Sequence, residues 1–438
     1  SGERRYRSSV AAEAPRATSR PIVIFDPRAG HGPGIGGSKT DSQIGMALDA
    51  GHPVYFLIFF TRTMPGQTLA DVRNAQIEFL EKVRECHPRA PKPAVIGNCQ
   101  GGWAAALVGA ERPDLVGPMV FNGSPLSYWG GVEGVNPMRY LGGLMGGVWI
   151  NSLLSDIGNG TFDGAHLVAN FENLNPANTL WAKNYHVYAN VDKEESRFLD
   201  FEKWWGGFFL MTDREIHQIV EGLFVGNKLE RGEFELEEGR RVDLKSNDNP
   251  VVVFASFGDN ITPPQQAFNW IVKTYGTVEE IKRRGQVIVC IGHSKIGHLG
   301  IFVSAKIARK EHKEIIASFD MLTYLPPGLY EMRIEEDPDQ AGEYAVKYIE
   351  KNMDDILALD DGLEDEKAFL AVRQVSETAD LFYRNMVSPW IRQANNDFFA
   401  DTLRQLHPMR MQRYMLSDLN PAMVPVKKTA ALIKSGRR

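Results

Sequence analysis

The stretch PAVIGNCQGGWAAA, at residues 93–106, constrains the fold of this chain more than any other. A short apolar run ends at Gly97, Cys99 stands between Gly97 and Gly101, and an alanine-rich segment that favours a helix follows. This order predicts a strand, a sharp turn and a helix, with the cysteine at the tip of the turn. Small residues are expected two places either side of it because bulkier side chains would overlap neighbouring backbone.

The pattern G-x-C-x-G is that of the nucleophile elbow of α/β-hydrolases, with cysteine in the place of serine. The helix that follows would direct its positive N-terminus at the sulfur, which favours a thiolate and helps to hold a developing oxyanion. The alternative interpretation is that Cys99 is a small core residue, since free cysteine is among the most buried residue types. The strand before it and the helix after it favour the nucleophile.

Strand-like and helix-like segments alternate along much of the chain. Strands are predicted at 21–25, 53–60, 94–96, 118–124, 250–257 and 286–292. Helices are predicted at 41–50 and 67–86. Such alternation is typical of a parallel sheet with helices on both faces, so the predicted class is α/β. The chain is expected to have an α/β-hydrolase fold with a mostly parallel sheet, an inserted cap region and a helical C-terminal extension.

Five regions are predicted from where the alternation starts, breaks and resumes. They are a flexible basic lead-in (1–20), a first core part (21–124), an inserted cap (125–247), a second core part (248–305) and a mainly helical C-terminal extension (306–438). The cap is rich in aromatic residues, which either wall a substrate pocket or form the core of the cap itself; the second interpretation is preferred for most of them. The extension holds one strand-like run, at 328–336.

An acid and a base are expected to serve Cys99. In the α/β-hydrolase order, an acid follows a later strand and a histidine follows the last core strand. Asp259 and either His293 or His298 occupy these places. The histidine would take the thiol proton, and the aspartate would orient and stabilise the charged ring. His298, in the setting G-H-L-G, is preferred as the base, with His293 as the alternative; Asp259 alternatively caps the helix after a Pro-Pro turn.

A glycine-rich loop, DPRAGHGPGIGGSKT at 26–40, follows the first strand. Part of it fits G-x-G-x-x-G, a dinucleotide-binding pattern. A Rossmann unit also needs an acidic residue at the end of its second strand, where this chain has TRT at 61–63. The favoured interpretation is a loop over an active site. The oxyanion hole would combine the N–H of Gln100 with one from this loop, near Asp26 or Pro27-Arg28, where Pro27 itself has no N–H to give.

Composition excludes several classes of function. The net charge of −6 and the pI of about 6.0 give no basic field for nucleic acid. Three cysteines do not make a disulfide framework, which indicates a reducing, cytoplasmic compartment. No apolar run approaches the roughly 18 residues of a membrane span. The histidines lack the spacing of a metal site, so no metal and no bound cofactor are expected.

These motifs together resemble a known family. The elbow GNCQGG is similar to the box of polyhydroxyalkanoate synthases, which have a cysteine flanked in this way and a doubled glycine after it. The stretches 47–60 and 215–267 and the motif GHLG also resemble this family, and the likeness covers roughly residues 20–305. The loop at 26–40 and the tail depart from a standard synthase and look like an uncharacterised bacterial synthase-related branch.

The resemblance implies a function. Cys99 would be the nucleophile, His298 the base and Asp259 its partner, in a Cys-dependent acyltransferase acting on hydroxyacyl-CoA thioesters, with coenzyme A entering only as part of the substrate. A polyester granule surface and a second copy of the chain are the partners expected of such an enzyme. The alternatives are a thioesterase or esterase-type hydrolase on the same triad, or a non-catalytic relative that binds granules or acyl-CoA. The intact Cys, Asp and His argue against the last.

Overall fold

The centre of the molecule is an eight-stranded sheet, in the order β12-β11-β10-β9-β4-β3-β1-β2. The computed structural model describes residues 18–32, 34–35, 41–336, 343–415 and 417–436. The strands of the sheet are β1 (Ile22–Phe25), β2 (Val54–Leu57), β3 (Ala94–Asn98), β4 (Met119–Asn122), β9 (Val251–Ser256), β10 (Val287–His293), β11 (Gly328–Glu336) and β12 (Tyr344–Glu350). Neighbouring strands are parallel except β11 and β12. The prediction of a mostly parallel sheet is confirmed.

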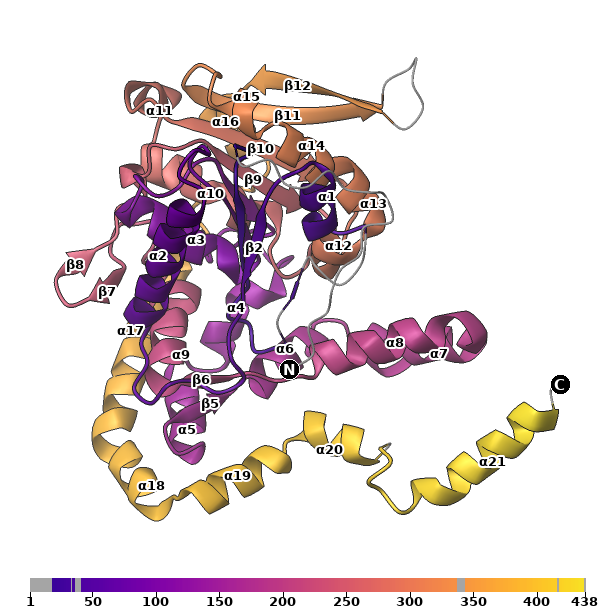
Figure 1. Cartoon of the computed structure of the whole chain (residues 1–438). Helices are drawn as coiled ribbons and strands as arrows, with labels where there is room; N and C mark the ends of the chain where they lie inside the picture. Colours follow the sequence, from indigo (N-terminus) through magenta and orange to yellow (C-terminus); the bar gives the residue numbers. More distant parts are fainter. Residues whose placement is uncertain (1–17, 33, 36–40, 337–342, 416, 437–438) are drawn as a thin grey trace.

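Helices cover both faces of this sheet (Figure 1). Along β1, Val23 and Phe25 join one hydrophobic cluster while Ile22 and Ile24 join the other, because successive side chains of a strand point to opposite faces. The first cluster includes α2 (Leu69–Cys86), α3 (Gln100–Glu111), α10 (Pro264–Tyr275) and α11 (Val278–Arg283). The second includes α1 (Gln43–Asp49), α12 (His298–Val303), α13 (Ala305–Ile307), α14 (Lys313–Ala317) and α15 (Phe319–Leu322), and η4 (Ala308–His312) connects α13 to α14.

The expected basic lead-in falls mostly outside the described residues, which begin at residue 18. Its last residue, Arg20, is buried and belongs to the fold. The Arg20 guanidinium lies 2.7 Å from a carboxylate oxygen of Asp320 and donates to the carbonyl of Lys92 at 2.6 Å. The expectation of a flexible arm is therefore wrong for Arg20, because these contacts fix its side chain.

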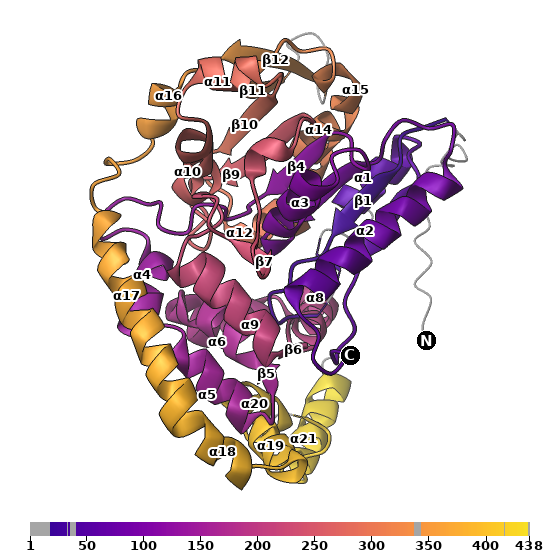
Figure 2. The same cartoon turned by 90° about the vertical axis from the view of Figure 1, so that its left-hand side faces the viewer.

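A cap is inserted between β4 and β9, as predicted, and lies beyond the carboxyl ends of the strands (Figure 2). Its elements are α4 (Pro137–Leu144), α5 (Trp149–Ile157), β5 (Thr161–Asp163), α6 (Ala165–Asn173), η1 (Asn178–Ala182), α7 (Lys183–Ala189), α8 (Val191–Trp205), β6 (Leu210–Thr212), α9 (Asp213–Ile219), η2 (Val220–Val225), β7 (Glu235–Glu237), β8 (Arg240–Arg241) and η3 (Leu244–Ser246). The cap therefore covers the edge at which parallel sheets carry their ligand sites.

The C-terminal region first completes the sheet and only then becomes helical. The predicted run at 328–336 is strand β11, and β12 pairs with it to form the outer edge. The predicted core boundary at residue 305 therefore lies inside the sheet domain and is corrected to about residue 350. The remaining helices are α16 (Met353–Leu357), α17 (Lys367–Phe382), η5 (Tyr383–Val387), α18 (Ser388–Ala394), α19 (Asp397–Gln405), α20 (Pro408–Met415) and α21 (Met423–Gly436).

Helices α17 to α20 run along the outside of the cap (Figure 2). Charged and polar side chains bind the two together. The pairs are Arg139 with Asp365, Ser152 with Asp380, Asp156 with Tyr383 and Arg392, and Asp163 with Arg410. On the core side, Lys273 of α10 forms an ion pair with Glu366, and Asn269 donates to Asp360. We call the segment 359–415 the strap, because it joins the sheet domain to the cap.

Candidate active site

Cys99 stands at the turn between β3 and α3, with φ 51° and ψ −124°. This conformation is rare for a residue with a side chain and is held by its surroundings. The neighbouring glycines are required by close packing. A Cβ at Gly97 would overlap the backbone of Gly101 and Gly102, and one at Gly101 would overlap the carbonyl oxygen of Phe25. The predicted strand, sharp turn and helix are all present.

The structure brings together the three residues predicted for catalysis. His298 Nε2 lies 3.2 Å from Cys99 Sγ, and His298 Nδ1 lies 2.7 Å from Asp259 Oδ2. All three side chains are buried. Cys99 follows β3, Asp259 follows β9, and His298 begins α12 after β10. Parallel strands end at one edge of a sheet, and this is why residues so far apart in sequence meet there. This topology with its elbow is the α/β-hydrolase fold.

Asp259 uses its two oxygens for different contacts. Oδ2 accepts from His298, while Oδ1 accepts the N–H groups of Ile261 at 2.8 Å and Thr262 at 2.9 Å. The alternative interpretation of Asp259, as the cap of the following helix, is wrong, because Oδ1 accepts from the turn before α10, and the N-cap of α10 is Pro263, without a side-chain hydrogen bond. These bonds fix the carboxylate and so the orientation of the imidazole.

The pKa of His298 is raised from 6.5 to about 10. Burial on its own would lower this pKa, because it disfavours a charged ring. The Asp259 carboxylate and the Cys99 sulfur, both in contact with the ring, outweigh burial and stabilise the imidazolium. His298 therefore holds a proton at neutral pH. A residue that later returns a proton to a leaving group must hold one.

His293, the alternative base, lies elsewhere. It is the last residue of β10, and its Nδ1 accepts the N–H groups of Lys295 at 3.2 Å and Ile296 at 3.1 Å. These bonds shape the turn that leads to His298. His293 is therefore placed to support the loop, and His298 alone of the two is bonded to Cys99 and Asp259.

One of the N–H groups predicted for the oxyanion hole, that of Asp26, forms a different hydrogen bond. Gln100 is the first residue of α3, so its N–H has no intrahelical acceptor and lies next to Cys99 as predicted. The N–H of Asp26, however, donates to the carbonyl of Leu57 at 3.2 Å. The pairing of β1 with β2 continues one residue beyond β1 and occupies this donor. The side chain of Asp26 is buried and accepts from the N–H of Gly34 at 3.3 Å; burial raises its pKa.

A group of buried amides behind the nucleophile was not identified from sequence. Asn98 donates to Gln43 Oε1 at 2.9 Å and to the carbonyl of Ile35 at 3.2 Å, and it accepts from Asn122 at 3.0 Å. These bonds tie β3, β4, α1 and the glycine-rich loop together next to Cys99. The signal was an asparagine immediately before the nucleophile and another near the end of the next strand, each in an otherwise apolar run.

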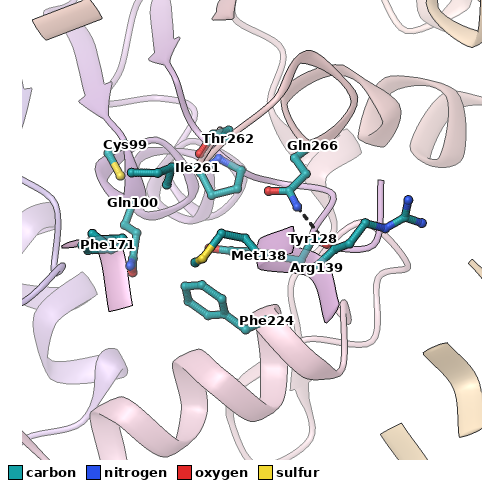
Figure 3. Close-up of a pocket in the computed structure, with 11 residues that line it drawn as sticks. Cys99, Gln100, Tyr128, Met138, Arg139, Phe171, Phe224, Ile261, Thr262 and Gln266 are labelled. Carbon is teal, nitrogen blue, oxygen red and sulfur yellow. Dashed lines mark hydrogen bonds between the residues drawn. The ribbon is translucent and has the colours of Figure 1, made fainter. Parts of the chain in front are cut away.

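The cap closes over Cys99 and leaves a small cavity beside it. Eleven residues line this cavity: Cys99, Gln100, Pro125, Tyr128, Met138, Arg139, Phe171, Phe224, Ile261, Thr262 and Gln266. Ten of them are labelled in Figure 3. Some cap aromatics thus wall the cavity, while others form the core of the cap, such as Trp205, or are exposed, such as Trp181. Aromatic residues of the cap are thus found both at the wall of this cavity and in the core of the cap.

The described residues contain neither a metal-binding cluster nor a helix that could cross a membrane. Within the described ranges, no three or more His, Cys, Asp or Glu side chains are arranged to hold a metal ion. In the same residues, no helix is both long and apolar enough to cross a membrane. Residues 33 and 36–40 of the glycine-rich loop, which include part of the G-x-G-x-x-G pattern, lie outside the described residues.

Comparison with curated proteins gives one relative that matches nearly the whole chain. It is "Uncharacterized protein in ackA 5'region" of Rhizobium meliloti, 48% identical over 428 residues, or 96% of this chain and 58% of the relative. The "Poly(3-hydroxyalkanoate) polymerase subunit PhaC" of Haloarcula marismortui is 24% identical and covers 54% of this chain and 50% of its own length. That of Allochromatium vinosum is 25% identical over 70% of this chain and 82% of its own length.

The resemblance to polyhydroxyalkanoate synthases is therefore confirmed as distant homology. The chain spans little more than half of the Rhizobium meliloti relative and half of the Haloarcula marismortui relative. Among solved structures, a monoacylglycerol lipase of Paleococcus ferrophilus aligns with a TM-score of 0.40 and 15% identity, over 70% of this chain and 96% of its own. The family model described as "Protein of unknown function (DUF3141)" matches residues 8–438, and the chain belongs to that family.

Proposed function

We propose that this chain is an acyltransferase that uses Cys99 to accept an acyl group from a hydroxyacyl thioester of coenzyme A. The observation that carries the proposal is the bonded series Cys99, His298 and Asp259 at the carboxyl edge of the sheet. The distant homology to PhaC polymerases supports the thioester as the substrate class. Cysteine suits this substrate, since exchange of one thioester for another replaces sulfur by sulfur.

The geometry supports a two-step reaction. With the proton on His298 Nε2, Sγ of Cys99 reacts as a thiolate and attacks the thioester carbonyl carbon. The negative oxygen of the tetrahedral intermediate accepts from the N–H of Gln100. When the intermediate collapses, the coenzyme A sulfur leaves with the proton held by His298, and an acyl-Cys99 thioester remains. In the second step His298 takes a proton from the acceptor hydroxyl, whose oxygen attacks the acyl-enzyme and frees Cys99.

The acceptor decides between transfer and hydrolysis. A substrate hydroxyl gives an ester, as in a polymerase, and water gives a free acid, as in a thioesterase. The closed cap over a buried Cys99 favours transfer, because it keeps bulk water from the acyl-enzyme. The granule surface and the second copy of the chain stay predictions from the resemblance.

The decisive experiment follows acylation of the protein directly. The wild type is mixed with 3-hydroxybutyryl-CoA, released CoA is measured by chromatography, and the acyl adduct is located by mass spectrometry. We expect CoA release and an adduct on Cys99 in the wild type and neither in Cys99→Ala. Analysis of the products then separates polyester from free acid. No adduct and no CoA release from the wild type would overturn the proposal.

The two histidines provide a matched pair of variants. His298→Ala should slow acylation by about 10²–10⁴-fold, the usual contribution of a general base. His293→Ala removes an acceptor of two turn N–H groups but no contact with Cys99, so most of the rate should remain. The reverse order of effects would assign the base to His293.

A further inference from the structure

The cavity beside Cys99 is small, with a volume of about 20 Å³. A single water molecule needs about 10–15 Å³ of such a cavity, so there is room for little more than one small group. Apolar side chains form much of its wall, among them Met138, Phe224 and Ile261. A long acyl chain does not fit unless these side chains move.

Three polar groups of this wall are incompletely paired among the described residues. Gln100 Oε1 and Thr262 Oγ1 have no hydrogen-bond partner, and the Tyr128 hydroxyl, which contacts the indole N–H of Trp103, has no acceptor for its own proton. The three residues are 3%, 4% and 0% exposed. A buried polar atom without a partner destabilises the protein, so native structures rarely keep one without a use. Three such residues around one cavity with the nucleophile point to a ligand that supplies the missing hydrogen bonds.

The backbone on which these groups sit is fixed. Gln266 Nε2 donates to the carbonyl of Tyr128 at 3.1 Å, the dashed line in Figure 3. The N–H of Thr262 is held by Asp259 Oδ1. Gln100 lies in the first turn of α3, directly after Cys99. The hydrogen-bonding groups therefore keep their positions relative to the nucleophile.

The charges nearby favour a neutral group over an anion. Arg139 is the one permanently charged residue in the wall, and its guanidinium is turned away from Cys99 in Figure 3. It forms an ion pair with Asp365 and donates to the carbonyl of Gly131, so its charge is compensated. Among the described residues of the wall, a carboxylate or phosphate would therefore find no uncompensated cation. A hydroxyl matches, since Gln100 Oε1 accepts, and the hydroxyls of Tyr128 and Thr262 can donate or accept.

We infer that this cavity is a recognition site for a hydroxyl group on the acyl chain, formed by Gln100, Tyr128 and Thr262. The inference rests on the proposed function and goes further, because it assigns the choice between hydroxyacyl and plain acyl groups to these residues. A short hydroxyacyl group satisfies the three buried atoms. The same group without its hydroxyl leaves them unpaired and binds less well.

The test compares two thioesters of equal chain length, 3-hydroxybutyryl-CoA and butyryl-CoA. The single-turnover rate of Cys99 acylation is measured for each by mass spectrometry, and the ratio of the two rates is the readout. The wild type should be acylated tenfold or more faster by the hydroxyacyl substrate. A rate difference of this size is expected when the substrate without a hydroxyl loses about one neutral hydrogen bond or more. Tyr128→Phe and Thr262→Val, which each remove one hydroxyl at nearly constant shape, should move this ratio toward one.

Control variants separate recognition from general damage. Tyr275→Phe removes the hydroxyl of a buried tyrosine that is not in this cavity, and the ratio should keep its wild-type value. Thr262→Ser retains the hydroxyl and should retain the preference. If one of the two variants does not fold, the other still tests the site, and equal rates in the wild type would still overturn the inference.

The outcomes distinguish the inference from the function on which it rests. Wild-type protein that is acylated equally fast by both thioesters would overturn the inference and leave the proposed function standing. Wild-type protein that is acylated by neither would overturn both. A preference that persists in both Tyr128→Phe and Thr262→Val would remove these two residues from recognition and so refute the site.

Discussion

Asp259 shows how one side chain both builds and tunes this site. One oxygen holds the turn through the N–H groups of Ile261 and Thr262, and the other faces His298. The same carboxylate keeps the pKa of His298 raised although the ring is buried. The position of the base therefore depends on Asp259, and its proton affinity depends on Asp259 together with Cys99.

Asp259→Asn separates these two tasks. Asparagine keeps an oxygen for the turn, but its amide group cannot accept from His298 Nδ1, which then has to present the wrong nitrogen to Cys99. We expect acylation to slow by about 10²–10⁴-fold, and the pKa of His298 to fall. Stopped-flow acylation and NMR titration of the imidazole measure the two effects, with circular dichroism to verify the fold. An unchanged pKa would show that Asp259 does not stabilise the charged ring.

The raised pKa of His298 also predicts how stability depends on pH. The ring has a pKa near 6.5 when unfolded and about 10 when folded, so the folded state binds the proton more tightly. The contribution to the free energy of unfolding is complete below about pH 6.5 and is lost as the pH rises toward 10. Urea titrations at pH 7 and pH 9.5 should show a larger fall for the wild type than for His298→Ala. Equal falls in the two proteins would contradict the shift.

The elbow is the element on which the site depends most. Cys99 keeps its unusual backbone conformation because the strand, the turn and the helix approach one another at glycines. The contact of Gly101 with the carbonyl of Phe25 also fixes α3 against β1. Backbone contacts at these glycines thus help to position the nucleophile against the sheet.

Gly101→Ala should disturb this arrangement. The new methyl group overlaps the Phe25 carbonyl, and crowding of this kind costs about 1–3 kcal/mol in the free energy of unfolding. Acylation of Cys99 should also be lost, because the turn must shift. Gly207→Ala is the control, since a methyl group there meets atoms at ordinary contact distances of 3.5 Å or more. Denaturant unfolding and the acylation assay measure both; wild-type values for Gly101→Ala would refute the close-packing argument.

The strap is the second element with a measurable role. Arg139 is buried, and its ion pair with Asp365 joins α4 of the cap to the start of the strap. Asp365→Asn leaves a buried guanidinium without its counter-charge, and such a change costs about 3–5 kcal/mol. We expect faster hydrogen exchange in α4 and α17. The matched control is Glu364→Gln, which removes only an exposed partner of Lys367 and should change little.

At the scale of the whole molecule, the cap controls access to the thiol. Cys86 is exposed, Cys99 is 5% exposed, and Cys290 is half-buried with its pKa raised to about 12 by burial. Iodoacetamide should therefore modify Cys86 first and Cys290 last, with Cys99 limited by opening of the cap. In Asp365→Asn, labelling of Cys99 should be faster and labelling of Cys86 unchanged, as peptide mass spectrometry can show. Equal rates of Cys99 labelling in the wild type and in Asp365→Asn would show that the strap does not control access to Cys99.

The sequence predicts the parts of this architecture that local pattern determines. The apolar runs and the G-x-C-x-G turn specify β3, β9 and β10 and the loops after them, and this is enough to place Cys99, Asp259 and His298 at one edge. The cap atoms that face Cys99, such as Tyr128 and Thr262, depend on how two distant segments pack, which no local pattern encodes. The oxyanion donor at Asp26 was wrong for a related reason, because strand pairing with β2 occupies its N–H. Likewise β12 is a half-exposed edge strand whose place depends on β11.

The strap gives the molecule a form of thermodynamic linkage. It is bonded to α10 of the sheet domain at one end and to α4, α5 and β5 of the cap along its length. A cap that opens has to weaken some of these bonds, so the equilibrium between closed and open forms includes their free energy. Any molecule that binds the strap more tightly when the cap is open therefore raises the population of the open form. By reciprocity, a substrate that binds under the closed cap stabilises the contacts between the strap and the cap. The strap is thereby coupled to how often Cys99 meets its substrate.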